Sequence, residues 1–189
     1  YGLKFLSSGL LYRYASQQLL KYKPKNKIKF LKLKFKKLKY NKINKINLHS
    51  PKISEYTSII AKQKKIRNVL KKFQQDFASK HKRVCIEGRD IGTVILPKAD
   101  LKFFFICNLK IAAKRRFKEL KKKNKFLKFK NVKKELQNRN LRDVSRKNSP
   151  LLKSPDAVIV DTGKTRNITM MINKMSKYMD RKILDKYGS

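Results

Sequence analysis

The spacing of apolar residues switches between two periods along the chain and predicts short strands separated by helices. Strands are expected at residues 3–6, 83–87 and 157–160. A fourth, at residues 101–107, is a nearly continuous apolar run, which is typical of a strand buried on both faces. Strands that alternate with helices favour an α/β fold, with a parallel sheet covered by helices on both faces.

Helices are expected where apolar side chains recur three or four positions apart, at residues 10–20, 50–61, 66–77, 109–122, 132–146 and 165–183. Serines at 7, 8 and 50 supply N-cap chemistry for the first two helices. The helix over 66–77 should bury one apolar face, made of Ile66, Val69, Leu70, Phe73 and Phe77. The last helix should likewise pack Ile168, Met171, Ile172, Met175 and Met179 into the core, without a role in cofactor binding.

Lysines interleave with apolar residues between residues 22 and 48, where period two predicts two short strands or a bent hairpin. The phase of that alternation slips at Phe30-Leu31, which suggests the bend. A poorly ordered insertion solvated by its lysines is the alternative. A further short extended piece is expected at residues 94–96, just before Pro97.

The two cysteines, Cys85 and Cys107, lie in apolar, strand-like stretches. Their separation offers no metal-binding spacing, so a reduced, buried pair is the simplest interpretation. The apolar runs are too short for a membrane-spanning helix, and no charged-then-apolar signal segment opens the chain. We therefore expect a soluble, cytoplasmic protein.

The chain has 189 residues, with 52 Lys and Arg against 12 Asp and Glu, a formal net charge of +40. Its length and its 40% hydrophobic content fit one compact domain with a core. The charge by itself suggests a nucleic acid or another anionic partner, because clustered basic side chains neutralise phosphates. Compositional drift that loads lysine onto the whole surface is a competing explanation.

The arginines are few and are not scattered. Arg13 follows a strand-turn-helix junction, and Arg89 lies in the glycine-bounded turn after a strand. Arg67 lies early in a predicted helix, and Arg115 and Arg116 are an adjacent pair. Arg139, Arg142, Asp143 and Arg146 fall at i, i+3, i+4 and i+7 of one predicted helix. Ligands of α/β sheets bind at the carboxyl ends of strands, where Ser8, Arg13, Arg89 and Asp90 fall. This pattern fits a ligand with several phosphates, although each piece could also be a helix cap, a turn or a charged surface.

Four stretches of the chain resemble bacterial cytidylate kinases, in the nucleoside monophosphate kinase group. They are residues 6–13 (LSSGLLYR), Ser58 with Arg67, residues 88–94 (GRDIGTV) with Pro97 and Asp100, and residues 139–151 from Arg139 through Arg142-Asp143 to Arg146. Residues 156–162 (DAVIVDT) also resemble the last strand of the family. The similarity covers nearly the whole chain except residues 21–48.

The resemblance implies a P-loop NTPase-like three-layer α/β fold and transfer of the terminal phosphoryl group of ATP, with Mg, to CMP or dCMP. It assigns the acceptor phosphate to Arg13, Arg89 and Arg146, near Ser8. It assigns the cytosine to Ser58, Arg67 and Asp90, and the ribose to Asp143 supported by Arg139. Arg115, Arg139 and Arg142 belong to a mobile lid over the ATP phosphates. No metal ligand is assigned among these residues.

The resemblance also implies a division into a core (residues 1–20 and 83–114), a CMP-binding insertion (21–82), a lid (115–150) and a C-terminal strand and helix (151–189). A monomer is expected. Two departures stand out: Ser7 occupies the position of a family Asp, and no Gly-x-x-x-x-Gly-Lys-Ser/Thr phosphate loop occurs in the sequence. Because the chain begins at Tyr1, we expect about 25 upstream residues with the first strand and that loop to be missing, which would leave this fragment inactive.

Two other functions stay open at this point. One is a basic RNA- or ribosome-binding protein, favoured by the charge and by lysines interleaved with aromatic residues around residues 28–40. The other is a related kinase for a different monophosphate such as UMP. The RNA-binding function does not account for the placement of the arginines and of Asp90 and Asp143, whereas the choice between pyrimidine monophosphates needs a comparison of acceptors.

Overall fold

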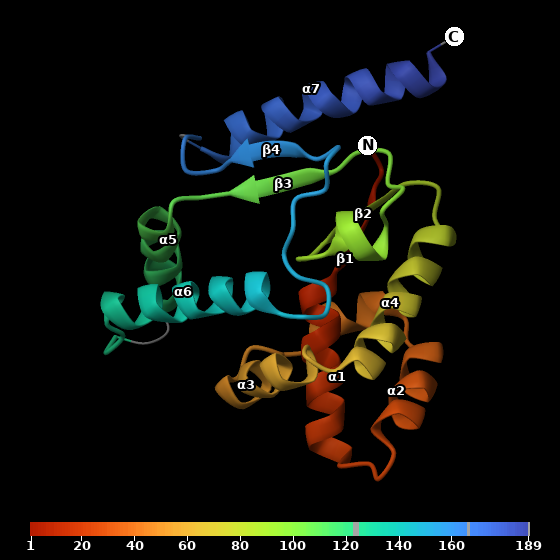
Figure 1. Ribbon diagram of the computed structural model, residues 1–189, viewed down its shortest axis with the longest axis vertical. Coiled ribbons are helices and arrows are strands. Elements are labelled where there is room, and N and C mark those ends of the chain that lie inside the picture. The colour runs from red at the N-terminus through yellow and green to blue at the C-terminus, as the bar shows by residue number, and fades with distance from the viewer. Residues whose placement is uncertain (123–124, 166, 189) are drawn as a thin grey trace. The chain divides into compact units, whose positions relative to one another are not determined.

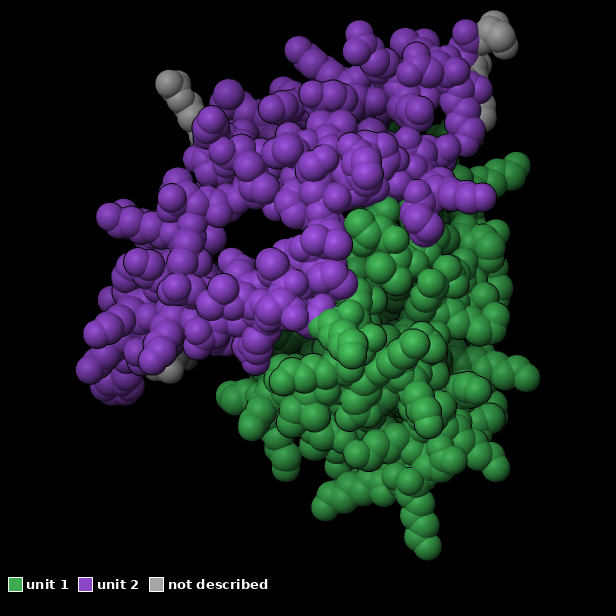
Figure 2. All heavy atoms as spheres, in the orientation of Figure 1, with its two compact units in different colours: residues 1–96, 147–149 green, residues 97–146, 150–189 purple. Residues whose placement is uncertain are grey.

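The structure is a computed structural model that describes residues 1–122, 125–165 and 167–188 (Figure 1). The chain forms two compact units, coloured separately in Figure 2. Unit 1 contains residues 1–96 and 147–149, and unit 2 contains residues 97–146 and 150–189. No helix in the described residues is long and apolar enough to cross a membrane.

Unit 1 contains one pair of parallel strands and several helices. Its elements are β1 (Lys4–Ser7), α1 (Ser8–Tyr22), α2 (Lys27–Lys36), η1 (Tyr40–Lys45), α3 (Pro51–Ile60), α4 (Lys64–Ser79), β2 (Val84–Glu87) and η2 (Ile91–Ile95). The register runs from Lys4 opposite Val84 to Ser7 opposite Glu87. Both strands and the predicted helices α1, α3 and α4 are confirmed.

Serine side chains begin two of these helices, as the sequence predicts. Ser7 accepts a hydrogen bond from the Leu10 amide at the start of α1, and Ser50 accepts one from the Ile53 amide at the start of α3. In α4, the apolar face is buried at Ile66, Val69 and Leu70, while Phe73 and Phe77 are partly buried against the same core. These helices therefore share one hydrophobic cluster that also contains Leu6 of β1.

The prediction of strands within residues 22–48 is wrong, because α2 and the short helix η1 occupy most of this segment. The apolar residues of this segment fit the period of a helix as well as that of a strand. Ile28, Leu31 and Phe35 fall at positions i, i+3 and i+7 of a helix. Leu31 and Phe35 are buried and Ile28 is half-buried. The Asn26 side chain accepts from the Lys29 amide and starts the helix. Lysine is also a good helix former, so local preferences favour the helix.

The extended piece predicted at residues 94–96 is also wrong, since residues 91–95 form the wide helical turn η2. The Ile95 amide donates to the Asp90 carbonyl at 3.2 Å, and the Leu96 amide donates to the Ile91 carbonyl at 2.7 Å. These bonds span five residues, as in a π-type turn. The turn begins directly after Asp90 and buries Ile95.

Unit 2 contains the second pair of parallel strands. Its elements are β3 (Phe103–Ile106), α5 (Leu109–Lys121), α6 (Phe129–Ser145), β4 (Val158–Asp161) and α7 (Ile168–Tyr187). The register runs from Phe103 opposite Val158 to Ile106 opposite Asp161. All five elements were predicted and are confirmed. The described strands thus form two parallel pairs, one in each unit, and the predicted parallel pairing of strands is confirmed at that level.

Burial in unit 2 is lower than the sequence predicts. Phe105 and Ile106 of β3 are 51% and 41% exposed, so this strand is not buried on both faces. Phe103 packs against Tyr178 of α7, at 6.2 Å between ring centroids, and Val160 of β4 is buried, whereas Ile159 is 48% exposed. The prediction of a core face on α7 is only partly correct. Met171, Met175 and Met179 of that face are half-buried, but Ile168 is 70% exposed.

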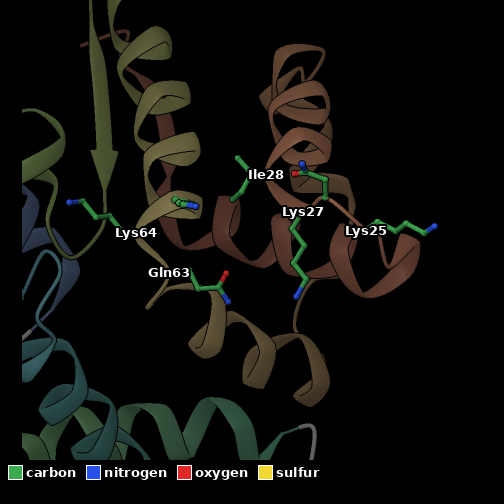
Figure 3. A pocket seen from close by; sticks show the side chains of 7 residues that line it. Lys25, Lys27, Ile28, Gln63 and Lys64 are labelled. Carbon is green, nitrogen blue, oxygen red and sulfur yellow. The ribbon is translucent and has the colours of Figure 1, made fainter.

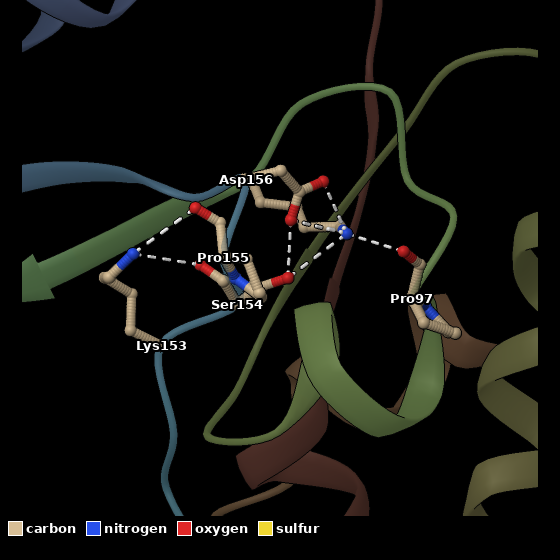
Figure 4. Close-up of polar contacts among 6 residues, drawn as sticks. Pro97, Lys153, Ser154, Pro155 and Asp156 are labelled. Carbon is tan, nitrogen blue, oxygen red and sulfur yellow. Dashed lines mark hydrogen bonds and ion pairs between the residues drawn. The ribbon is translucent and has the colours of Figure 1, made fainter.

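A buried lysine, Lys102, joins the starts of β3 and β4. Figure 4 labels its partners Pro97, Ser154 and Asp156. The Lys102 ammonium donates to the Pro97 carbonyl at 2.5 Å, to Ser154 Oγ at 3.3 Å and to Asp156 Oδ2 at 2.7 Å. The hydrogen bond from Lys102 and a second from Ser154 lower the pKa of Asp156 to about 2. This polar cluster holds together the two chain segments that lead into β3 and β4.

Both cysteines are free thiols, as predicted, but neither is buried. Cys85 is exposed because the side chains of β2 alternate, and Val84 and Ile86 take the inner face. Cys107 is partly exposed just after β3. Loss of hydration next to the strand raises the pKa of the Cys85 thiol, and the nearby negative charge of Glu87 raises it further by a smaller amount.

Candidate functional site

The carboxyl ends of β1 and β2 bring two sequence motifs together in unit 1. Because the strands are parallel with Ser7 opposite Glu87, the residues that follow them meet at one edge. Ser8 begins α1 there and is 5% exposed, and the half-buried Arg89 and buried Asp90 follow β2. A side chain at Gly88 would place its Cβ 2.9 Å from Ser8 Cβ, so only glycine permits this close approach.

Arg67 and Asp90 form a buried ion pair beside this edge. Arg67 Nη2 donates to Asp90 Oδ2 at 2.5 Å, and the two side chains are only 8% and 6% exposed. Arg67 Nη1 donates to the Ala61 carbonyl at 3.1 Å, and its guanidinium lies 5.7 Å from the centroid of the Tyr12 ring. The pair is therefore held in one geometry, with a planar donor beside a carboxylate acceptor.

The other residues predicted for the acceptor take part in local contacts of α1 and α3, which pack together. Arg13 Nη1 donates to Ser54 Oγ at 2.8 Å and to the Leu48 carbonyl at 3.1 Å. The Ser58 hydroxyl donates to the Glu55 carbonyl of its own helix at 2.7 Å. Arg67 is thus paired with Asp90. Ser58 lies on α3, the helix that ends just before Ala61, whose carbonyl accepts from Arg67.

Two polar residues at this edge were not identified from the sequence. The Ser7 hydroxyl donates to Glu87 Oε1 at 2.5 Å, and the Ser7 amide donates to Tyr40 Oη at 2.6 Å. Glu87 could have been noticed, because it directly precedes the Gly88-Arg89-Asp90 motif. Tyr40 carried no signal, since it lies in the lysine-rich segment whose fold was predicted incorrectly.

In unit 2, the charged face predicted on α6 is confirmed in part. Asp143 Oδ2 lies 3.9 Å from Arg139 Nε, and Asp143 Oδ1 lies 3.3 Å from Arg146 Nη1. Arg146 follows the last residue of the helix. Arg142 is exposed and donates to the Asn138 carbonyl one turn earlier at 3.2 Å. The face therefore contains a carboxylate between two guanidiniums, with a third guanidinium directed elsewhere.

Arg115 lies on α5 and is exposed. Its Nη2 donates to the Thr162 carbonyl at 2.8 Å, directly after β4 ends. The neighbouring Arg116 instead forms an ion pair with Glu119 of the same helix at 2.8 Å. Of this arginine pair, Arg115 is therefore the one held at the carboxyl end of a strand.

A lysine-lined hollow of about 430 Å³ lies between the start of α2 and the start of α4 (Figure 3). It is lined by Lys25, Asn26, Lys27, Ile28, Gln63, Lys64 and Lys65. Lys25 and Lys64 extend in opposite directions in this view, so these two ammonium groups do not converge on one ligand position. Within the described ranges, no group of three His, Cys, Asp or Glu side chains could hold a metal ion.

Parallel strands whose carboxyl ends carry arginines and a buried Arg–Asp pair are typical of α/β proteins that bind phosphorylated ligands. The protein-family model described as cytidylate kinase matches residues 1–181. The chain therefore belongs to the cytidylate kinase family, for which the P-loop NTPase class of α/β fold is implied.

Curated relatives agree with this assignment. A cytidylate kinase of Clostridium tetani is 38% identical over 141 residues, which cover 75% of this chain and 62% of that protein. One of Bartonella tribocorum is 35% identical over 167 residues, covering 86% and 76% of the two chains. One of Thermosipho melanesiensis is 41% identical over 115 residues, covering 61% and 52%. The matches thus span about half to three quarters of the relatives' lengths, and they do not favour the RNA-binding alternative.

Proposed function

We propose that the protein is a (d)CMP kinase, which transfers the terminal phosphoryl group of ATP to CMP or dCMP and yields CDP or dCDP. The observation that carries this proposal is the buried Arg67–Asp90 pair at the carboxyl edge of the β1–β2 pair. Relatives named cytidylate kinase support the substrate class.

The pair suits the edge of a cytosine ring. Cytosine presents an amino donor beside ring-nitrogen and carbonyl acceptors, which match a carboxylate acceptor and guanidinium donors. Because Arg67 and Asp90 are buried, a base without that pattern would leave their remaining donors and acceptors unmatched. Ser58, on α3, would complete the reading of the ring after a change of its present hydrogen bond to Glu55. This reasoning favours a pyrimidine acceptor over AMP or GMP.

Arginines would supply most of the remaining contacts. Arg89 lies two residues after β2 and, with Arg13 and Arg146, would hold the acceptor phosphate close to Ser8. Asp143 with Arg139 would accept from the ribose hydroxyls. Arg115, Arg139 and Arg142 would act as a lid that neutralises charge on the transferring group. The acceptor phosphate is already anionic, so no general base is needed, and positioning with charge neutralisation carries the reaction.

ATP would enter with Mg²⁺, which neutralises phosphate charge when bound. The 189 residues contain no Gly-x-x-x-x-Gly-Lys-Ser/Thr sequence to hold the ATP phosphates. For the working enzyme we propose the three-layer P-loop NTPase sheet, of which each parallel strand pair is a building element. The division into core, CMP-binding insertion (21–82) and lid (115–150) belongs to the same proposal, as does a cytoplasmic monomer.

The direct test is a coupled ADP-release assay with CMP, dCMP, UMP, AMP and GMP as acceptors. It should use these 189 residues and, separately, the same chain with any residues that its gene encodes before Tyr1. The second protein should prefer CMP or dCMP strongly, and the same rate with all five acceptors would refute the proposal. Arg89→Lys should reduce kcat/KM for CMP about 100-fold although the charge is kept, because a bidentate contact is lost. Lys82→Arg, the opposite exchange at an exposed position just before β2, serves as its control.

A further inference from the structure

Tyr40 of η1 connects the lysine-rich segment to the edge where the acceptor is expected. The Ser7 amide donates to Tyr40 Oη at 2.6 Å, and the Ser7 hydroxyl donates to Glu87 Oε1 at 2.5 Å. Three segments far apart in the sequence therefore meet at one serine: the end of β1, the end of β2 and the start of η1.

Water cannot easily replace the tyrosine in this contact. Ser7 is 7% exposed, so its amide needs a partner inside the protein. The Tyr40 ring packs against Phe77 of α4, with 5.7 Å between the ring centroids, and this contact fixes the direction of the hydroxyl. Burial raises the pKa of Tyr40, so the side chain stays neutral at physiological pH.

The residues next to these contacts are those that the proposed function uses. Ser8 follows Ser7 directly, and Gly88, Arg89 and Asp90 follow Glu87 directly. The backbone at Gly88 approaches Ser8 so closely that no side chain would fit between them, so the two turns lie next to each other. The segment is attached a second time, where Arg13 donates to the Leu48 carbonyl at 3.1 Å.

We propose that Tyr40 is a positioning residue for the acceptor nucleotide, which sets the place of Ser8 and of the turn with Arg89 and Asp90 through Ser7 and Glu87. It touches no reacting atom in this role. The proposal rests on the proposed function, and it gives the lysine-rich segment 21–48 a part in acceptor binding beyond a solvated surface.

Tyr40→Phe tests the proposal, because it removes one oxygen and keeps the ring on Phe77. In the active protein, the KM for CMP should rise about tenfold, as expected for one lost hydrogen bond to a buried group, while the KM for ATP stays within about twofold. Tyr14→Phe is the matched control, because the Tyr14 ring packs edge-on against Phe35 in the same unit and lies away from Ser7. It should leave both KM values unchanged.

Hydrogen exchange gives a second readout that does not depend on activity. In Tyr40→Phe the amides of Ser7 and of the first turn of α1 should exchange at least about tenfold faster than in wild type, while those of α4 keep their rates. Unchanged exchange at Ser7, or an equal rise of both KM values together with faster exchange throughout unit 1, would overturn the positioning role. If the wild type prefers another monophosphate, the proposed function fails, and the KM ratio is then measured with that acceptor.

Discussion

Unit 1 and unit 2 each contain one pair of parallel strands, but they differ greatly in how much apolar surface they bury. Among the described residues, all but three of the buried apolar side chains lie in unit 1. The exceptions in unit 2 are Ala113, Val132 and Val160. The charged residues do not divide in the same way, since Lys102 of unit 2 is also buried. Among the arginines, however, Arg67 is almost fully buried beside Asp90 in unit 1, whereas Arg139 in unit 2 is 56% exposed.

This contrast suggests two ways of using the same type of side chain. A guanidinium held in a packed core presents a fixed pattern to a ligand, which suits selection of a base. A guanidinium on an exposed helix can change its partner at little cost, which suits groups that must move onto a phosphate during a reaction. The predictions below test this difference, from the largest expected effect to the smallest.

Arg67→Met should destabilise unit 1 strongly, because it leaves the Asp90 carboxylate buried without its cation. We expect a loss of about 3–5 kcal/mol in the free energy of unfolding, measured by urea denaturation followed by circular dichroism. Lys72→Met is the control on the same helix, since Lys72 and Asp76 form an exposed pair at 3.4 Å worth less than about 1 kcal/mol. A loss below about 1 kcal/mol for Arg67→Met would contradict the idea of a rigid pair.

Arg142→Met in unit 2 should change the free energy of unfolding little and kcat strongly. Its side chain is exposed and donates to the Asn138 carbonyl of its own helix, so the free energy of unfolding should change by less than about 0.5 kcal/mol. If the residue neutralises the transferring group, kcat should fall about 100-fold in the acceptor assay. Lys133→Met, an exposed change on the same helix, should leave kcat unaltered. Equal kcat values in the two variants would remove Arg142 from the lid.

Acid should weaken the contact between the starts of β3 and β4. The Lys102 and Ser154 hydrogen bonds lower the pKa of Asp156 from 3.8 to about 2, so the stability they provide is present above pH 4 and is lost as the pH falls towards 2. Thermal melts between pH 5 and pH 2 should show this decline in wild type. Asp156→Asn should be less stable at pH 5 and should decline less than wild type, whereas Asp185→Asn on α7 should follow the wild-type curve. Parallel curves for wild type and Asp156→Asn would contradict the assignment.

The sequence predicts the order and type of most elements because caps and periods agree there. Ser50 with Pro51 begins α3, and the spacing from Ile66 to Phe77 defines the buried face of α4. The prediction failed for α2, where lysines separate apolar residues that satisfy a helix and a strand equally well. Burial of β3 was overestimated because an apolar run shows what a strand could bury, and whether another layer covers it depends on distant residues.

The candidate site could be predicted as a set of residues but not as a set of contacts. The family resemblance selects Arg67 and Asp90 as readers of one base, and the structure adds that they bind each other. Tyr40 was missed because a single aromatic residue among lysines gives no pattern, and only the chain path through η1 brings it to Ser7. Ser58 and Arg13 hold local partners whose identity depends on packing between α1 and α3.

The contact of Lys102 with Ser154 and Asp156 also has a consequence for synthesis on the ribosome. The strands of unit 1 are complete once Glu87 has left the exit tunnel, and nearly all of that unit precedes residue 97. Unit 2 must wait, because β3 emerges about 50 residues before its partner β4. During that interval the lysine stays hydrated and the aromatic strand beside it stays unpaired, so this stretch of the nascent chain is open to wrong pairing until β4 is synthesised.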